Sequence, residues 1–286
     1  MAITSDWHIH THCSCDSACM TFEDLVSETK ELGITDFGVS DHYHTTIQEA
    51  DIAASRKEYE KTLLRHPELK GKFHFGIEAT LVSKWEADKI ARGEYDELPV
   101  YGFRSGGPKN AEVCFDFDEE LLEKYKIEYV IAGMHWPMYC DFDASSVIKE
   151  YHRQYMYAAT HPYTDILAHY LWFDIHLFTN VWNIPGYRNP FEDFGAVPRS
   201  MKDELKAALL ENNVAFELNN WLFVDNLTEK FRDSYLGWVN ELQSAGVKIA
   251  FGSDNHSPHL KDLCDYRNRE EVCRKYGIKT DEFFCL

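Results

Sequence analysis

The feature that most constrains the fold of this chain is a short apolar run that ends abruptly in polar residues and recurs seven times. The runs cover residues 3–10, 37–42, 73–78, 129–135, 165–169, 214–219 and 247–254. Between them lie stretches whose apolar residues have helical spacing. Alternating strand and helix units favour a mainly parallel sheet covered by helices. Seven strands in one chain favour an α/β barrel that is closed or nearly closed over an open sheet.

The amphipathic stretches mark the positions where helices are expected. The first stretch, 21–33, opens with a threonine that can cap a helix and stops at Gly33. The other helices are expected at 118–126, 145–160, 199–213 and 233–246. A final helix followed by coil is expected after residue 257.

Residues 81–117 interrupt this alternation. Their charge is mixed, and the residues that disfavour regular structure include Gly102, Gly106, Gly107 and Pro108. We therefore expect an insertion after the third strand, such as a hairpin or a lid over a site. A length of 286 residues is normal for one α/β barrel, and no repeat or linker divides the chain. The sequence thus predicts one domain, 1–286, that carries this insertion.

The charge balance argues against two classes of partner. The chain has 29 lysines and arginines against 48 aspartates and glutamates, a formal charge of −19. Such a surface repels nucleic-acid backbones and anionic lipid, so we expect neither as a partner. No apolar run approaches the ~20 residues that span a bilayer. The sequence does not indicate an oligomeric state.

The cysteines and the N-terminal residues predict a location. The first ten residues contain neither a basic stretch nor an apolar run typical of a secretory signal, so we expect a cytoplasmic protein whose eight cysteines are mostly reduced. Cys13, Cys15 and Cys19 lie close together, but they are too few ligands for a cysteine-only zinc site.

Each apolar run ends in residue types that bind metal ions. In run order these residues are His8 and His10, Asp41 and His42, Glu78, His135, His169, Glu217 and Asn219, and Asp254 followed by His256. Side chains alternate along a strand, so the first two histidines share a face and can bind one ion together. Imidazoles and carboxylates suit zinc, iron or manganese, and catalytic groups of (β/α) barrels gather where the strands end. One histidine at a strand end commonly packs or caps, but so many together predict a metal centre.

Several residues near the candidate ligands could have either of two roles. Four histidines flank the candidate ligands and could either donate a proton or pack: His12, His44, His161 and His176. Four basic residues could contact phosphate or remain as solvated charges: Arg104, Lys109, Arg153 and Arg188. Glu217 and Asn219 could orient ligating imidazoles rather than bind an ion.

A set of short motifs resembles a known family. The motifs are DWHIHTH, GVSDH, GIEAT, VIAGMHW, DILAH, FELN and GSDNH. They occur in the order seen in the PHP (polymerase and histidinol phosphatase) family, and the resemblance extends from residue 6 to residue 256. It implies a distorted (β/α)7 barrel that holds a three-metal centre and hydrolyses phosphate esters.

The resemblance also implies a division of the ligands into three neighbouring sites. It assigns His8, His10 and Asp254 to the first ion, and Glu78 as a bridge from the first ion to the second. It assigns His135 and His169 to the second ion, and Asp16, His42 and His256 to the third. Asp16 lies in HTHCSCDSA, without the Ser-Asp-Gly more usual in the family, so Cys13 or Cys15 could replace it. We expect two to three divalent zinc, manganese or iron ions, with Asp254 and His256 also serving in catalysis.

These residues predict metal-dependent hydrolysis of a small phosphomonoester by a metal-activated hydroxide. Histidinol phosphate is the best-known family substrate. Bound divalent ions would attract an anionic substrate to an acidic protein. An alternative is amidohydrolase-type hydrolysis of an amide or lactone at the same centre, although no strand ends in a lysine that could be carbamylated. A nucleic-acid-processing module is disfavoured by the net charge, and a non-catalytic metal-binding protein by the number of candidate ligands.

Overall fold

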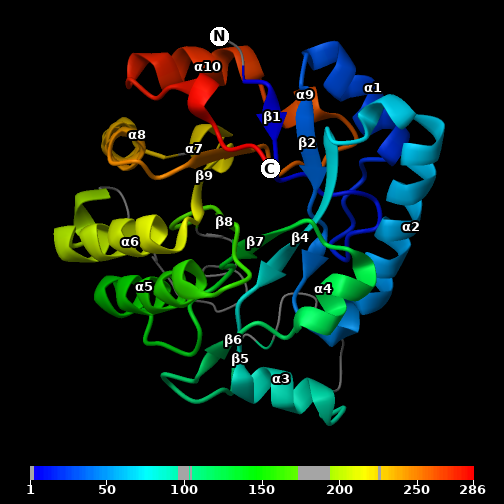
Figure 1. Cartoon of the computed structure of the whole chain (residues 1–286). Coiled ribbons are helices and arrows are strands. Elements are labelled where there is room, and N and C mark those ends of the chain that lie inside the picture. Colours follow the sequence, from blue (N-terminus) through cyan, green and yellow to red (C-terminus); the bar gives the residue numbers. More distant parts are fainter. Residues whose placement is uncertain (1–2, 96–102, 104, 173–193, 225–226) are drawn as a thin grey trace.

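The computed structural model describes the chain except residues 1–2, 96–102, 104, 173–193 and 225–226. Its strands form a parallel sheet in the order β1-β2-β4-β7-β8-β9-β10 (Figure 1). Their bounds are β1 Ser5–Asp6, β2 Asp36–Val39, β4 Phe73–Thr80, β7 Tyr129–Gly133, β8 Ile166–Leu167, β9 Ala215–Asn219 and β10 Ile249–Gly252. A short strand, β3 (His42–Tyr43), pairs with the second half of β4. Because every pair in this sheet is parallel, the carboxyl ends of the strands meet at one side.

Backbone hydrogen bonds join the two edges of this sheet. The N–H of Trp7 donates to the carbonyl of Phe251 (3.0 Å), and that of Asp254 donates to the carbonyl of His8 (2.7 Å). One residue pair further along, His10 N–H donates to the carbonyl of Asn255 (3.1 Å). The seven-strand sheet is therefore nearly closed, which confirms the predicted α/β barrel.

The long helices surround the barrel. They are α1 Phe22–Leu32, α2 Glu49–Arg65, α5 Ala144–Thr160, α6 Arg199–Asn212, α8 Glu229–Ser244 and α10 Tyr266–Lys275. Shorter helices are α4 Glu119–Tyr125, α7 Trp221–Val224 and α9 Leu260–Leu263, and 3-10 turns occupy Thr46–Gln48, Pro67–Leu69, Phe194–Ala196 and Thr280–Glu282. Figure 1 shows α1 and α2 on one side of the barrel, and α5, α6 and α8 on the other.

The predicted helices form close to the expected bounds. Thr21 caps α1 by accepting from the N–H of Asp24, and Gly33 ends that helix with a positive φ of 76°. Helix α8 begins four residues earlier than expected, because Thr228 caps it and accepts from the N–H of Phe231. The prediction missed α2, whose buried positions are Ile52, Ser55, Tyr59 and Thr62. Two of these four are small and polar, so the apolar periodicity of α2 is weak.

Residues 81–117 form a small two-stranded sheet and a helix that are separate from the barrel sheet. Strand β5 (Val82–Ser83) follows β4 directly and pairs antiparallel with β6 (Val113–Cys114). Helix α3 (Lys84–Ala91) lies between the two strands in the sequence and at the edge of the molecule in Figure 1. The segment therefore lies on the side of the barrel where the strands end.

Aromatic side chains fill the amino end of the barrel. The ring of Tyr129 lies against Gly76, where an added Cβ would be 2.5 Å from ring atoms. The Tyr129 hydroxyl donates to the carbonyl oxygens of Trp7 (2.8 Å) and Val39 (3.0 Å). Near the C-terminus, the carbonyl of Phe284 accepts from Trp7 Nε1 (3.0 Å), and the two rings pack edge to face. This end of the barrel is thus a packed core, which leaves the carboxyl end for a site.

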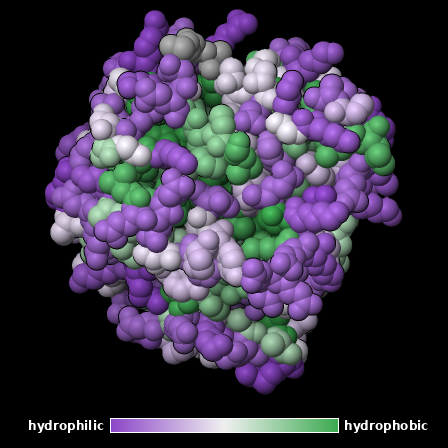
Figure 2. Space-filling model, in the orientation of Figure 1, coloured by the Kyte–Doolittle hydropathy of each residue, from purple (hydrophilic) through white to green (hydrophobic). Residues whose placement is uncertain are grey.

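The outer surface is largely polar. Figure 2 shows hydrophilic side chains over most of one face, with smaller hydrophobic areas between them. Among the described residues, no helix has both the length and the apolar character needed to cross a membrane.

Candidate metal centre

Glu78, on β4, is the centre of a cluster of buried histidines. Its side chain is fully buried, and each of its two oxygens contacts imidazole nitrogens. The contacts of Oε2 are His42 Nδ1 at 2.8 Å, His8 Nε2 at 3.3 Å and His10 Nε2 at 3.5 Å. The contacts of Oε1 are His169 Nε2 at 2.8 Å and His135 Nε2 at 3.2 Å. Five histidines from distant parts of the sequence therefore converge on one carboxylate.

His8 and His10 follow β1 and point into this cluster together, as period-2 alternation predicts. Their Nε2 atoms are 3.1 Å apart. Asp254 Oδ1 lies 3.5 Å from the first nitrogen and 3.3 Å from the second. Two neutral imidazoles with lone pairs this close would repel each other, whereas a shared cation would bind both. The structure thus brings together the residues predicted for the first ion.

His135 and His169 approach the opposite oxygen of Glu78. His135 Nδ1 lies 3.1 Å from the hydroxyl of Thr80, which leaves its Nε2 facing Glu78. His44 Nδ1 contacts the same hydroxyl, so Thr80 connects the two rings. Thr80 was not among the predicted site residues, because nothing in the sequence shows which ring a threonine will contact.

Asp16 joins the cluster from the loop after β1. Its Oδ2 lies 2.6 Å from His256 Nε2 and 3.4 Å from His42 Nε2. Among the described residues, neither Asp16 Oδ1 nor His10 Nδ1 has a hydrogen-bond partner, and both atoms are buried. Asp16, His42 and His256 are the set predicted for the third ion. A ring nitrogen of His10 also lies close enough to His42 and His256 to bind the same ion.

The cysteines take no part in the candidate ligand groups of the described residues. Burial raises the pKa of the Cys15 thiol to about 12, with a further contribution from the neighbouring Asp16 carboxylate. Burial likewise raises the pKa of Cys13 to about 11. Both thiols are therefore protonated at neutral pH in the metal-free chain. This geometry favours Asp16 over either cysteine.

Metal binding needs neutral imidazoles and ionised carboxylates, and the metal-free cluster meets this need only in part. Although burial opposes it, the neighbouring carboxylates raise the pKa of His8, that of His42 to about 10, and that of His256, so these rings must release a proton when an ion binds. Burial, with the neighbouring histidines, lowers the pKa of His10 to about 3 and contributes to lowering that of His135 to about 4. Burial alone would raise the pKa of Glu78 and Asp254, but the surrounding imidazoles hold both well below their usual range. The combination of imidazole and carboxylate donors fits divalent ions of the zinc, manganese or iron type.

Two residues of the cluster have strained backbone angles, and a glycine makes room for the central carboxylate. His169 and Asp254 each come just after a strand and have positive φ angles of 24° and 53°. Such angles are costly for residues other than glycine and often occur at functional sites. At Gly133 an added Cβ would lie 2.2 Å from Glu78 Oε1 and 3.0 Å from His135 Cε1. Only glycine leaves room there for the central carboxylate.

Asp41 does not join the cluster, although it lies at a strand end. Its Oδ1 accepts from the N–H of Thr11 (2.6 Å), and its Oδ2 from the hydroxyls of Thr11 (2.7 Å) and Ser55 (2.5 Å). Asp41 thus ties the loop after β1 to α2. The flanking histidines also differ from one another, since His12 contacts the carbonyl of Met20 and His161 packs among aromatic rings. His176 lies outside the described residues.

The basic residues considered for phosphate binding are paired with acids or lie outside the described residues. Lys109 is 2.6 Å from Asp141, and Arg153 is 2.7 Å from Glu150. Arg104 and Arg188 belong to the part of the chain that is not described. The cluster of candidate metal ligands is therefore the better place for a phosphate group to meet positive charge.

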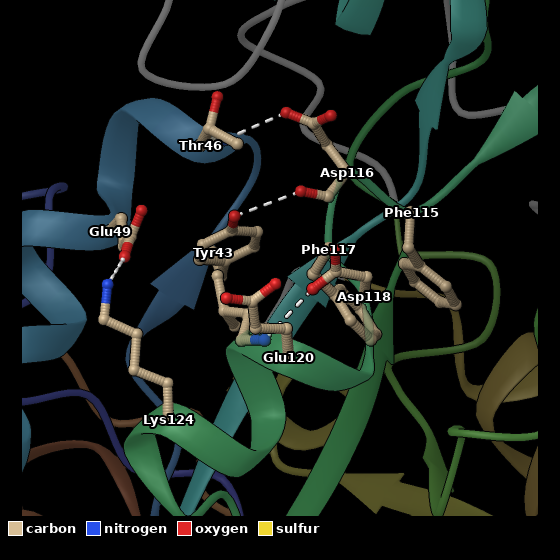
Figure 3. A pocket seen from close by; sticks show the side chains of 10 residues that line it. Tyr43, Thr46, Glu49, Phe115, Asp116, Phe117, Asp118, Glu120 and Lys124 are labelled. Carbon is tan, nitrogen blue, oxygen red and sulfur yellow. Dashed lines mark hydrogen bonds and ion pairs between the residues drawn. The ribbon is translucent and has the colours of Figure 1, made fainter.

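A groove of about 440 Å³ near β3 and α4 does not suit a phosphate (Figure 3). Its lining carries four carboxylates, those of Glu49, Asp116, Asp118 and Glu120. Lys124 also lines the groove, but its ammonium is 2.6 Å from Glu49. The excess of negative charge disfavours an anionic ligand here.

Comparisons with known proteins agree with this geometry. Among curated proteins, no sequence matches significantly. Among solved structures, the chain is similar to a histidinol phosphate phosphatase from Lactococcus lactis subsp. lactis, determined in complex with zinc, L-histidinol and phosphate. The TM-score is 0.60 at 16% sequence identity, over 97% of this chain and 95% of that one. This similarity shows a shared fold. The family model of the PHP domain matches residues 6–220, which is most of the sequence, and this chain therefore belongs to the PHP domain family.

Proposed function

We propose that this chain is a metal-dependent phosphatase hydrolase that acts on a small phosphomonoester. The observation that carries the proposal is the convergence of five histidines on the buried Glu78, with Asp16 and Asp254 beside them, at the carboxyl end of a PHP barrel. In (β/α) barrels this end is where catalytic groups gather.

Two to three divalent ions would be held by the nine residues of the cluster. His8, His10 and Asp254 would bind the first ion, His135 and His169 the second, and Asp16, His42 and His256 the third, with Glu78 between the first two. When bound, such ions lower the pKa of water and offset the charge of a phosphate ester. The protein's own part is to hold these donors in place and to exclude bulk water from most of them.

Asp254 and His256 are the members of the cluster most open to solvent. Their side chains are 24% and 38% exposed, whereas that of Glu78 is 1% exposed and that of His8 is fully buried. A substrate that arrives from solution would meet this edge first. We therefore assign these two residues to the face that binds the ester and exchanges protons with it.

Histidinol phosphate is the first substrate to test. The similar Lactococcus lactis enzyme holds L-histidinol and phosphate, although only 16% of its residues are identical to those of this chain. Hydrolysis of an amide or lactone at the same centre is the alternative. No lysine takes part in the contacts among the described residues of the cluster, which disfavours a carbamylated-lysine centre.

Two wider predictions remain proposals. We treat 1–286 as one domain with an insertion at 81–117, whose antiparallel β5–β6 pair supports a separate unit on the barrel. The eight cysteines are all free thiols, which supports the reducing, cytoplasmic setting expected from the sequence.

The test is a hydrolysis assay over a panel of small phosphomonoesters that includes histidinol phosphate, with amides and lactones at matched concentration. Metal content is measured on the same sample. The proposal predicts higher kcat/KM on at least one phosphomonoester than on any amide or lactone. Preference for an amide or lactone would support the alternative and contradict the proposal.

A further inference from the structure

Glu217, on β9, is a buried carboxylate outside the proposed ligand set. It is 1% exposed, and its Oε1 lies 2.6 Å from His8 Nδ1. Its Oε2 accepts from the backbone N–H of His169 (2.7 Å) and from Asn219 Nδ2 (2.9 Å). Asn219 Nδ2 is also 3.3 Å from Asp254 Oδ2. Glu217 thus connects, directly or through one amide, the proposed ligands that follow β1, β8 and β10.

The contact with His8 decides which ring nitrogen faces the cluster. A neutral imidazole carries one N–H, and a carboxylate at 2.6 Å places that hydrogen on Nδ1. His8 Nε2 then keeps its lone pair and points at Glu78, His10 and Asp254. A carboxylate behind a ligating histidine fixes both the tautomer and the orientation of the ring.

The hydrogen-bond pattern requires a carboxylate rather than an amide. Glu217 accepts from three donors: His8 Nδ1, the N–H of His169 and Asn219 Nδ2. A glutamine can accept only through its single oxygen. With its NH2 group on the Oε2 side it would face two other donors, and with the NH2 group on the Oε1 side it would make His8 Nδ1 an acceptor. The second arrangement would move the imidazole hydrogen to Nε2, where it blocks metal binding.

The surrounding structure is shaped around this carboxylate. At Gly252, on β10, an added Cβ would lie 2.0 Å from Glu217 Oε1 and 2.7 Å from His8 Cβ. A buried carboxylate is costly unless its oxygens accept hydrogen bonds, and two of the three donors to Glu217 belong to the proposed ligands His8 and His169.

We propose that Glu217 is a positioning residue of the metal centre. It holds His8 with Nε2 towards the cluster and fixes the position of His169 and Asp254 relative to it. The inference rests on the proposed function in that the cluster binds metal ions, but it does not depend on which ester is hydrolysed.

The test is the affinity for Zn²⁺, measured by competition with a chromophoric chelator. Glu217→Gln should weaken binding of the ion held by His8 by ~10–100-fold, the usual effect of removing a group that orients a ligand. NMR of isotope-labelled histidine in the zinc-loaded wild type should show the N–H of His8 on Nδ1, and this signal should shift or disappear in zinc-loaded Glu217→Gln. Asn219→Ala, which removes one donor and keeps the carboxylate, should weaken binding by a smaller factor.

Glu150→Gln is the matched control. Glu150, on α5, is 5% exposed and accepts from Arg153 and Gln154, so it has similar burial without contact to a proposed ligand. Wild-type Zn²⁺ affinity in Glu217→Gln, or an equal loss in Glu150→Gln, would overturn the inference. If Glu217→Gln does not fold, unchanged affinity in Asn219→Ala overturns it instead. The readout separates the two proposals, because a wild-type chain that binds Zn²⁺ but hydrolyses no phosphomonoester contradicts only the proposed function.

Discussion

Replacing Gly133 by alanine should disable the centre without unfolding the barrel. The new Cβ would lie 2.2 Å from Glu78 Oε1, more than 1 Å inside the 3.4 Å at which ordinary contacts begin. Glu78 cannot move that far and keep its 2.8 Å contacts with both His42 and His169. A displacement of about 1 Å in a catalytic arrangement can cost ~100-fold in rate. We therefore expect kcat/KM on phosphomonoesters to fall by about 100-fold, together with weaker metal binding.

The same substitution at Gly237 provides the control. Gly237 lies inside α8, and an added Cβ there would meet nothing within 4 Å. Gly237→Ala should keep wild-type turnover and raise the free energy of unfolding by about 0.5–1 kcal/mol, because alanine favours helix. The assay is steady-state kinetics with metal content and a thermal melt on both variants. Wild-type kinetics in Gly133→Ala would refute the argument that Glu78 organises the site.

Three further predictions follow from the geometry. His10→Ala should abolish turnover and leave a folded chain, as judged by circular dichroism, because its Nε2 is 3.1 Å from that of His8; wild-type turnover would mean that the pair is structural. Asp16→Ala should keep a near-native melting temperature but lose about one metal ion and at least ~10-fold in kcat/KM, and unchanged metal content and kinetics would place the ligand elsewhere, with Cys15 the next residue to test. Although burial opposes it, Asp36 and Glu128 raise the pKa of His74 to about 9, so its charged form stabilises the fold fully below about pH 6.5, and this stabilisation is lost as pH rises through 9. His74→Gln should therefore lower the free energy of unfolding in urea by about 2 kcal/mol at pH 6 and by much less at pH 10, and an equal loss at both values would contradict this assignment.

The sequence predicted the elements whose pattern is local. Strands buried on both faces appear as short apolar runs, and the alternation of side chains correctly placed His8 and His10 on one face. Thr21 and Gly33 marked the ends of α1 because helix capping depends on neighbouring residues alone. The motif order also predicted which distant residues meet, and the structure brings all nine predicted ligands into one cluster.

The features that sequence reasoning missed depend on tertiary contacts. Helix α2 buries Ser55 and Thr62, which carry no apolar signal. Asp41 ends a strand run as a ligand would, yet it binds Thr11 and Ser55 instead. Residue type cannot separate these roles, because both use the same carboxylate oxygens. The positions of Thr80 and Gly133 beside the cluster likewise become visible only once β4 and β7 are paired.

The central claim is that this PHP barrel is a metal-dependent phosphatase. Elemental analysis of the purified protein, on the same sample whose phosphomonoester hydrolysis is measured, tests it most directly. We predict two to three transition-metal ions per chain, with activity lost when a chelator removes them and restored when they are returned. An active protein that contains no metal ion would contradict the account.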